Sequence, residues 1–273
     1  MSRLRGIPST LIGGGIVGVF VLLALLAPWI APHEVGARAG APGLGPGGDY
    51  WLGTDALGRD ILSRVLHGAR ISLGVAGVAV VVGGLAGLVV GLVSGVRGGR
   101  VDLLLQRTVD LVLAFPALVL LLVAARLIGP STMNVAMVIA VVVAPGVARV
   151  VRGAVLVERE QPYIEAARAL GAGDTRIVLQ HLLPNIAPLV VVVTTTLLAS
   201  AMLAEASLSF LGLGVPPPNP SWGADVAAAR SAFPVNVGQV VAPGAAMALA
   251  VLGVTLLGDG LRDALDPRLR GRA

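Results

Sequence analysis

The chain has 273 residues, of which 56% are hydrophobic and only 13% are charged, whereas roughly a quarter are charged in soluble domains. All 20 Lys and Arg residues are arginine, and without lysine this chain alone can form neither a P-loop nor a Schiff base. It has no cysteine, which excludes disulfides, thiolate catalysis and Cys-ligated metals. The net charge of +5 could suggest nucleic acid, but only 3% of residues are aromatic, so we expect a membrane protein with no nucleic-acid partner.

Six stretches are long and apolar enough to cross the hydrocarbon core of a bilayer as helices. They are 11–31, 71–95, 111–128 (begun a turn or two earlier, near Leu103), 134–151, 186–213 and 240–257. The first is too long for a typical signal-peptide core and ends beside Trp29, an interfacial residue that suits a retained anchor. The chain is therefore predicted to be an all-α polytopic membrane protein with six transmembrane helices.

Arginine placement predicts the orientation of these spans, because cytoplasmic loops carry the excess of basic residues. With the N-terminus inside, 14 of the 20 arginines face the cytoplasm. The other six, mostly in segment 32–70, are Arg38, Arg59, Arg64, Arg70, Arg126 and Arg230. Both termini are therefore predicted to be cytoplasmic and segment 32–70 extracytoplasmic.

Segment 32–70 is predicted to contain a loop and then a helix. Residues 36–48 are too rich in Gly and Pro for regular structure. Residues 60–70 have an apolar face and a polar face, the polar one holding Ser63, Arg64, His67 and Arg70. This pattern suits a helix lying in the membrane interface or a surface helix packed on the outer loops.

The second span carries glycines at strict four-residue spacing, and this stripe predicts a helix contact. They are Gly83, Gly87, Gly91, Gly95 and, just beyond the span, Gly99. In lipid, helices associate through close backbone approach over small residues. A chain with 37 glycines could also reach this spacing by composition alone.

The longest polar stretch, 152–185, has the pattern of two short helices. Pro162 suits a first turn, a helix is predicted over 163–170, and Gly171 is placed for a left-handed cap. Asp174 is predicted to cap a second helix, 175–183, stopped by Pro184. The small and charged residues of the first helix could enter a partner's groove, although pattern alone leaves a solvated amphipathic loop as an alternative.

The residues from Glu165 to Asn185 resemble the EAA loop of ABC importer permeases, written E-A-A-x-x-x-G with Ile and Leu-Pro following. In that family the loop is the coupling helix, which docks into a cleft of the ATPase subunit. The resemblance implies an ATPase-coupling set consisting of Glu165, Ala166, Ala167, Arg168, Gly171, Ile177, Leu183 and Pro184. Of these, Ile177, Leu183 and Pro184 would anchor the loop to the fifth span.

Three further stretches, 51–64, 205–223 and 258–267, resemble the dipeptide/oligopeptide/nickel branch of these permeases, and its C-type member most. The resemblance covers about 51–268 and implies the type I ABC importer permease fold. The implied domains are 1–31, the N-terminus and first span; 32–70, the outer loop and interfacial helix; 71–257, the transmembrane core with coupling loop 152–185; and 258–273, a cytoplasmic C-terminal tail.

The function implied is that of a permease subunit of an ATP-driven importer in the bacterial plasma (inner) membrane, for dipeptides or oligopeptides, with nickel left open. The implied partners are a second homologous permease, two ABC ATPase subunits that bind the ATP, and an extracytoplasmic substrate-binding protein. The chain itself is expected to be no enzyme and to hold no cofactor, metal or catalytic residue. An ion-coupled secondary transporter is the alternative from another class, but it leaves the coupling loop unexplained.

Polar residues within spans are the candidates for the translocation path. They are Thr194, Thr195, Thr196 and Ser200 on the fifth span, with Glu205 near its outer end. The alternative for the threonines is hydrogen bonding back to their own helix. The alternative for Glu205 is a structural partner such as Arg126 or Arg230, and near the third span an ion pair is predicted between Arg107 and Asp110.

Overall fold

The computed structural model describes residues 3–230 and 237–265, and within them the regular structure is helical. In chain order the elements are α1 (Arg3–Ile30), α2 (Ile61–Arg97), α3 (Gly99–Ala114), α4 (Ala117–Ile128), α5 (Thr132–Glu158), α6 (Pro162–Ala169), α7 (Asp174–Ile177), the π-helical turn η1 (Val178–Leu182), α8 (Leu183–Phe210), α9 (Trp222–Ala229) and α10 (Gly238–Leu265). Residues 266–273 of the expected C-terminal tail lie outside the described residues.

Five helical segments are long and apolar enough to cross a membrane, which confirms five of the six predicted spans. They are Ser9–Ile30, Ile61–Arg97, Thr132–Glu158, Asp174–Phe210 and Gly238–Leu265. The span predicted over 111–128 is not one helix. Together α3 and α4 are apolar enough for a sixth span, but they are bent by 93° where they meet, as in a broken span or a re-entrant loop. Phe115 is extended just before Pro116, as expected from the clash that a proline ring imposes on the residue before it.

Residues 60–70, predicted to form a helix in the interface or on the surface, are instead the first turns of the 37-residue α2. Asp60 caps this helix by accepting a hydrogen bond from the Ser63 backbone N–H at 2.8 Å. Ser63 and Arg64, expected on a polar outer face, are buried. The predicted face was wrong because these polar side chains have partners inside the molecule.

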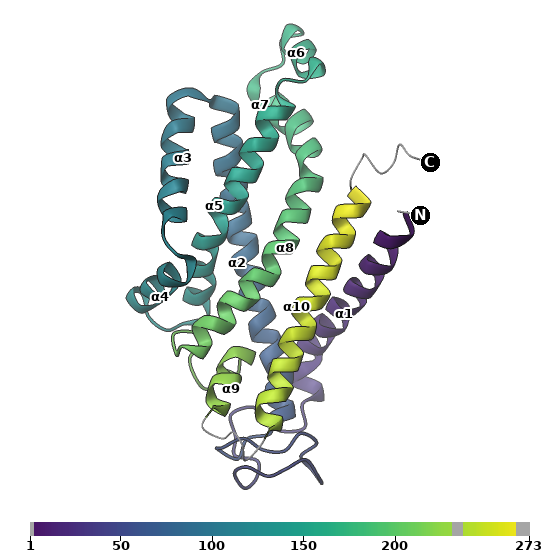
Figure 1. Cartoon of the computed structure of the whole chain (residues 1–273), viewed down its shortest axis with the longest axis vertical. Helices are drawn as coiled ribbons and strands as arrows, with labels where there is room; N and C mark the ends of the chain where they lie inside the picture. The colour runs from purple at the N-terminus through teal and green to yellow at the C-terminus, as the bar shows by residue number, and fades with distance from the viewer. Residues whose placement is uncertain (1–2, 231–236, 266–273) are drawn as a thin grey trace.

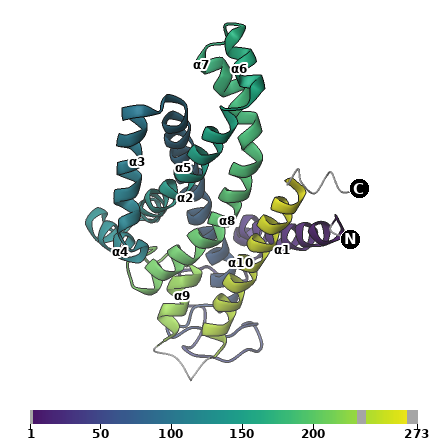
Figure 2. The ribbon, with the colours of Figure 1, turned by 45° about the horizontal axis from the view of Figure 1, so that its top comes forward.

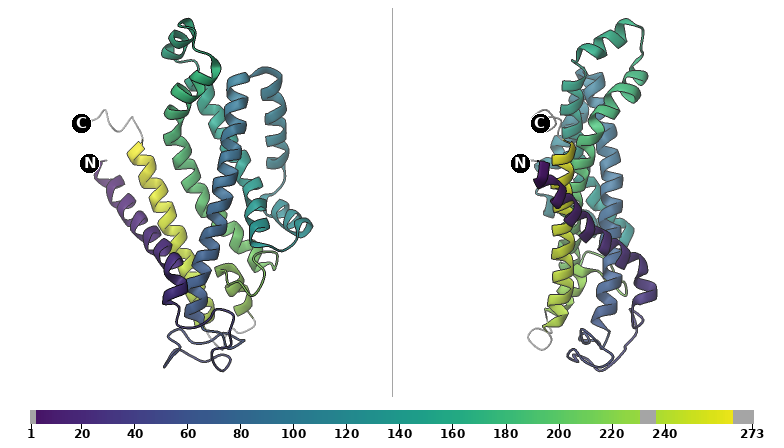
Figure 3. Two further views of the ribbon diagram at one scale, coloured as in Figure 1. Left: turned by 180° about the vertical axis from the view of Figure 1, so that it is seen from behind. Right: turned by 90° about the vertical axis from the view of Figure 1, so that its right-hand side faces the viewer.

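The long helices run roughly along one axis, so the molecule has two distinct ends (Figure 1). We call the end that carries α6 and α7 the α6 end, and the opposite end, which carries α9 and segment 31–60, the loop end. The start of α1 and the end of α10 both point towards the α6 end (Figure 3). Segment 31–60 holds only two isolated bridges among its turns.

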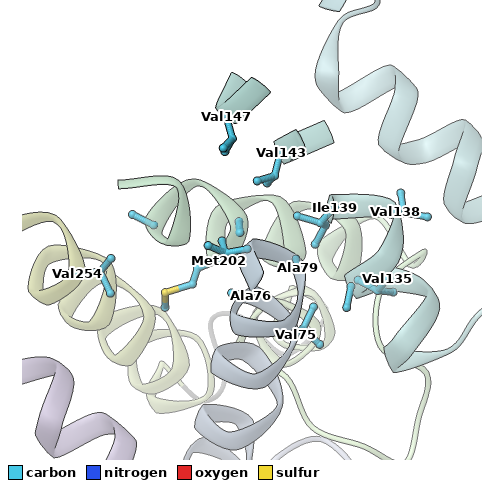
Figure 4. Packing of buried hydrophobic residues seen from close by; sticks show 14 of the residues in the cluster. Val75, Ala76, Ala79, Val135, Val138, Ile139, Val143, Val147, Met202 and Val254 are labelled. Atoms are coloured by element: carbon cyan, nitrogen blue, oxygen red, sulfur yellow. The ribbon is translucent and has the colours of Figure 1, made fainter. Parts of the chain in front are cut away.

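The core is built on α2, which packs mainly against α5 and also against α8. Val75, Ala76 and Ala79 of α2 are almost fully buried, and Figure 4 shows side chains of α5, α8 and α10 around them. Small alanines let the helices approach closely, as association in lipid requires. At one side α1 packs along α10, where Gly13 and Gly253 each lie too close to the other helix for a Cβ atom.

Candidate functional site

The segment α6, α7 and η1, which we call the knob, projects beyond the bundle at the α6 end (Figure 2). Pro162 lies in the first turn of α6, and Gly171 has a φ of +84°, so the predicted first helix and its left-handed cap are confirmed. The Ala172 N–H donates to the Ala167 carbonyl at 3.0 Å and the Gly171 N–H to the Arg168 carbonyl at 2.9 Å. This is the Schellman arrangement, which satisfies carbonyls at the helix end.

The second predicted helix, 175–183, does not stop at Pro184. Instead α7, η1 and α8 follow one another without a break, and Pro184 lies in the first turn of α8. The π-helical turn joins the Leu183 N–H to the Val178 carbonyl five residues back. It widens the helix just before Pro184, which has no N–H to continue the ordinary i→i−4 ladder. Asp174 is the first residue of α7, and Gly173 occupies the cap position.

The knob has an exposed outer surface and an apolar inner one. Of the predicted coupling residues, Glu165, Ala166, Arg168, Gly171 and Pro184 are exposed, Ala167 and Leu183 are half-buried, and Ile177 is buried. Ile164 and Leu182, which sequence reasoning missed, are buried with Ile177 in the hydrophobic core. The sequence signal for both was the apolar inner face of each short amphipathic helix.

A hydrogen-bond chain fastens the knob to two long helices. The Tyr163 hydroxyl of α6 donates to the Glu158 carboxylate at the end of α5, and the Asn185 side chain of α8 donates to the Tyr163 oxygen at 2.7 Å. The His181 ring lies edge-on to Tyr163 with ring centres 5.9 Å apart. Burial and the bonded Glu158 carboxylate raise the pKa of Tyr163, so the phenol is neutral at physiological pH. Sequence reasoning did not single out this group.

The glycine stripe of α2 lies against α5, the helix that leads to the knob. A Cβ atom on Gly83, Gly87 or Gly91 would lie 2.4 to 2.6 Å from a backbone carbonyl oxygen of α5, and one on Gly95 would lie 2.7 Å from the Val155 side chain. Gly99 begins α3 and has open space around it. The stripe therefore sets how closely α2 and α5 approach.

Two ion pairs hold α3 to α5. Arg152 of α5 binds Asp102 with two hydrogen bonds, of 2.6 and 2.7 Å. Arg149 of α5 binds Asp110 at 2.6 Å. The predicted pair of Arg107 with Asp110 is therefore wrong, because α5 lies beside α3 and supplies the cation.

The predicted path residues of α8 differ in exposure and in hydrogen bonding. Ser200 is exposed, whereas the hydroxyls of Thr194, Thr195 and Thr196 donate to carbonyls of their own helix at 2.8 to 3.0 Å. Further along α8 is a hollow of about 340 Å³. Its lining includes Leu118, Leu203, Ser207, Phe210, Val226 and Met247, from α4, α8, α9 and α10. Sequence reasoning did not select Ser207 because its neighbours along the hollow come from distant segments, and its hydroxyl, like those of the threonines, donates to a carbonyl of α8, that of Leu203, at 2.7 Å.

Glu205 faces the interior of the subunit, away from that hollow. It is 1% exposed, and its carboxylate accepts hydrogen bonds from Ser72 of α2 at 2.9 Å and Ser209 at 2.7 Å. The predicted alternative, a pairing with Arg126 or Arg230, is wrong. Arg230 instead lies over the Phe210 ring, 5.2 Å from its centre.

At the loop end, arginines assigned to the outside have partners within the protein. Arg64 of α2 binds Asp225 of α9 through Nε at 2.9 Å and through Nη2. Arg59 binds Asp55, four residues earlier, at 2.6 Å. Both arginines therefore have structural partners within the loop end.

Comparisons with known proteins agree on one family. Residues 87–271 match the model of the binding-protein-dependent transport system inner membrane component, and residues 1–41 match that of the N-terminal TM domain of oligopeptide transport permease C. The chain is 40% identical over 270 residues to the di/tripeptide transport system permease protein DppC of Pseudomonas aeruginosa, covering 95% of this chain and 89% of the relative.

Two more relatives and a solved structure agree with these matches. Identity is 41% to the glutathione permease protein GsiD of Salmonella typhimurium, covering 98% of this chain and 89% of the relative. The chain is 38% identical to the probable D,D-dipeptide transport system permease protein DdpC of Escherichia coli, covering 98% of this chain and 91% of the relative. A chain of the inward-facing MetNI methionine ABC transporter matches in fold, with a TM-score of 0.63, 23% identity, and coverage of 76% of this chain and 98% of that one.

Proposed function

The chain belongs to the family of binding-protein-dependent transport system inner membrane components, and we propose that it is the subunit through which an ABC importer moves dipeptides or oligopeptides into a bacterial cell. As a member of that family it is a multi-pass inner-membrane permease component. Relatives that carry di/tripeptides, D,D-dipeptides and glutathione support the peptide class. A nickel importer is the second candidate, from the branch resemblance alone.

In this proposal the knob couples the subunit to an ATPase. The single observation that carries it is that α6 projects from the bundle yet is hydrogen-bonded, through Tyr163, to both α5 and α8. A docked partner that moves α6 would therefore displace the start of α8 as well. Glu165, Ala166 and Arg168 form the exposed contact surface, and Ile177 and Leu183 hold it to the bundle.

The proposed orientation places the α6 end in the cytoplasm and the loop end outside. Two ABC ATPase subunits bind and hydrolyse the ATP, so this chain needs no cofactor. A second homologous permease completes the path and an extracytoplasmic binding protein delivers the substrate at the loop end. The arginine distribution supports this orientation, because the outer arginines Arg59 and Arg64 are held in internal ion pairs.

The proposed path follows the exposed face of α8 past Ser200 to the hollow beside Ser207. Alternating access is then a rocking of two permeases against each other, driven through the knobs. Thr194 and Thr195 would act indirectly, because their hydroxyls bond to their own helix and their methyl groups lie beside Gly84 of α2 and Gly258 of α10. Glu205 would act indirectly, by holding α8 against α2.

The experiment that tests this function is uptake by the complete complex in vesicles. Uptake of a labelled dipeptide should stop when ATP is depleted while an ion gradient is held. Continued uptake would overturn the ABC mechanism and favour an ion-coupled transporter. Co-purifying the complex with its binding protein and identifying the bound ligand by mass spectrometry then decides between a peptide and nickel.

A further inference from the structure

A small cavity lies at the loop end where α2, α9 and α10 meet. Its lining includes Arg64 from α2, Asp225 from α9, and Gln239 and Pro243 from α10. The space open to the centre of a water molecule is about 10 Å³, near the 10–15 Å³ that a single buried water needs on this measure. Arg64, Asp225 and Gln239 are each more than nine-tenths buried.

Three polar atoms of these lining residues have no hydrogen-bond partner among the described residues: Arg64 Nη1, Asp225 Oδ2 and Gln239 Oε1. The rest of the ion pair is satisfied, because Asp225 Oδ1 accepts from Arg64 Nε and Nη2. An unpaired buried polar atom costs about 1–3 kcal/mol, and more when it is charged. Three such atoms, on residues that line one cavity, therefore indicate a ligand that bonds to all of them.

The chemistry of the three atoms selects the ligand. Arg64 Nη1 can only donate a hydrogen bond, whereas Asp225 Oδ2 and Gln239 Oε1 can only accept one. The ligand must therefore supply one acceptor and two donors in the volume of a single heavy atom. A cation would be repelled by Arg64 and could not accept from it, and an anion would be repelled by Asp225.

We propose that this cavity is a binding site for one water molecule, which accepts from Arg64 and donates to Asp225 and Gln239. The water joins α10 to the ion pair that already links α2 to α9. It extends that contact to a third helix, whereas the direct bonds between Arg64 and Asp225 join only α2 and α9. This site goes beyond the proposed transport function and does not depend on it.

The first test is a structure of the complete complex at a resolution that shows ordered water. We expect a density peak within hydrogen-bond distance of all three atoms. Absence of the peak would overturn the proposal. So would a direct bond from the Gln239 side-chain amide to Asp225, because the ligand would then have no site.

The second test removes one acceptor. Gln239→Met keeps the side-chain length, so we expect the water peak to weaken or vanish and the midpoint of thermal unfolding in detergent to fall by about 2–4 °C. Gln180→Met is the matched control, because Gln180 is exposed and its side chain accepts a hydrogen bond from Arg176 in the knob. Equal unfolding midpoints for the two variants would contradict the proposal. If Gln239→Met does not fold, the presence or absence of the water peak in the unaltered chain decides whether the water is bound.

Discussion

Asn185, in the first turns of α8, donates a hydrogen bond of 2.7 Å to the hydroxyl of Tyr163 in α6, 22 residues earlier. The same hydroxyl donates to Glu158 at the end of α5. One phenol therefore joins the projecting knob to the helices on both sides of it. Because the bond to α8 is direct, we expect a displacement of α6 to reach α8 without relying on the backbone between them.

Tyr163→Phe should weaken the coupling between ATP hydrolysis and uptake. The variant keeps the ring against His181 but loses both hydrogen bonds, each of which contributes about 0.5–1.5 kcal/mol. We expect the ratio of peptide taken up to ATP hydrolysed, measured in vesicles, to fall several-fold. Tyr50→Phe removes the only other tyrosine hydroxyl, bonded to Ala39 at the loop end, and should leave that ratio unchanged. An unchanged ratio in Tyr163→Phe would show that the phenol is only structural.

Glu165→Arg should abolish docking of the ATPase. The side chain is exposed on the outer surface of the knob, so reversing its charge should not disturb folding, whereas like charges set against each other at an interface cost several kcal/mol. We expect the subunit to reach the membrane in normal amount while co-purification of the ATPase and stimulation of its activity are lost. Glu34→Arg reverses an exposed charge at the loop end and serves as the control. Retention of both uptake and ATPase stimulation in Glu165→Arg would refute the docking assignment.

Gly171→Leu should uncouple the transporter through the backbone. Gly171 has a φ of +84°, a conformation that costs a residue with a Cβ about 1–2 kcal/mol, so the turn between α6 and α7 should change. Gly173→Leu is a matched control, since Gly173 also has open space for a Cβ but a φ of −74°. We expect uptake to fall much more in the first variant at equal membrane levels. Similar losses in both would instead indicate that added bulk at the interface is responsible.

The local turns of the knob could be predicted from sequence, but contacts between distant segments could not. The left-handed cap at Gly171 could be predicted because its signal, a glycine directly after a short helix, is local. Pro116 and Pro184 have the same local signal, yet one bends the chain and the other lies within a continuous helix, because a π-helical turn precedes Pro184. The pairing of Arg64 with Asp225 spans 161 residues, so a helical wheel of 60–70 alone placed Arg64 on the wrong surface.

Gly87→Ala should destabilise the packing of α2 on α5. The added Cβ would lie 2.4 Å from the Ala144 carbonyl oxygen, a backbone atom that cannot move without shifting α5, and overpacking of this kind costs about 1–3 kcal/mol. We expect a lower midpoint of thermal unfolding in detergent. Gly77→Ala lies on the same helix with nothing within 4 Å of the new Cβ, and should be neutral or stabilising because alanine favours helix. Equal midpoints would mean that α2 and α5 can separate freely.

The buried pair of Arg64 and Asp225 should show strong coupling in a double-mutant cycle. Breaking a buried ion pair by removing one partner leaves an uncompensated charge and costs about 3–5 kcal/mol, whereas replacing both residues with apolar ones is often neutral. We therefore expect Arg64→Met and Asp225→Leu each to destabilise the subunit more than the double variant does, as measured by thermal unfolding in detergent.

The exposed pair of Arg149 and Asp110 is the internal comparison for that cycle. Its side chains are 57% and 50% exposed, against 8% for each side chain of the buried pair. Water screens such a pair, so its coupling should be about 0–1 kcal/mol. If the single variants at Arg64 and Asp225 destabilise additively, with no more coupling than Arg149→Met and Asp110→Leu, bulk solvent must screen the loop-end pair and the burial described for it would be wrong.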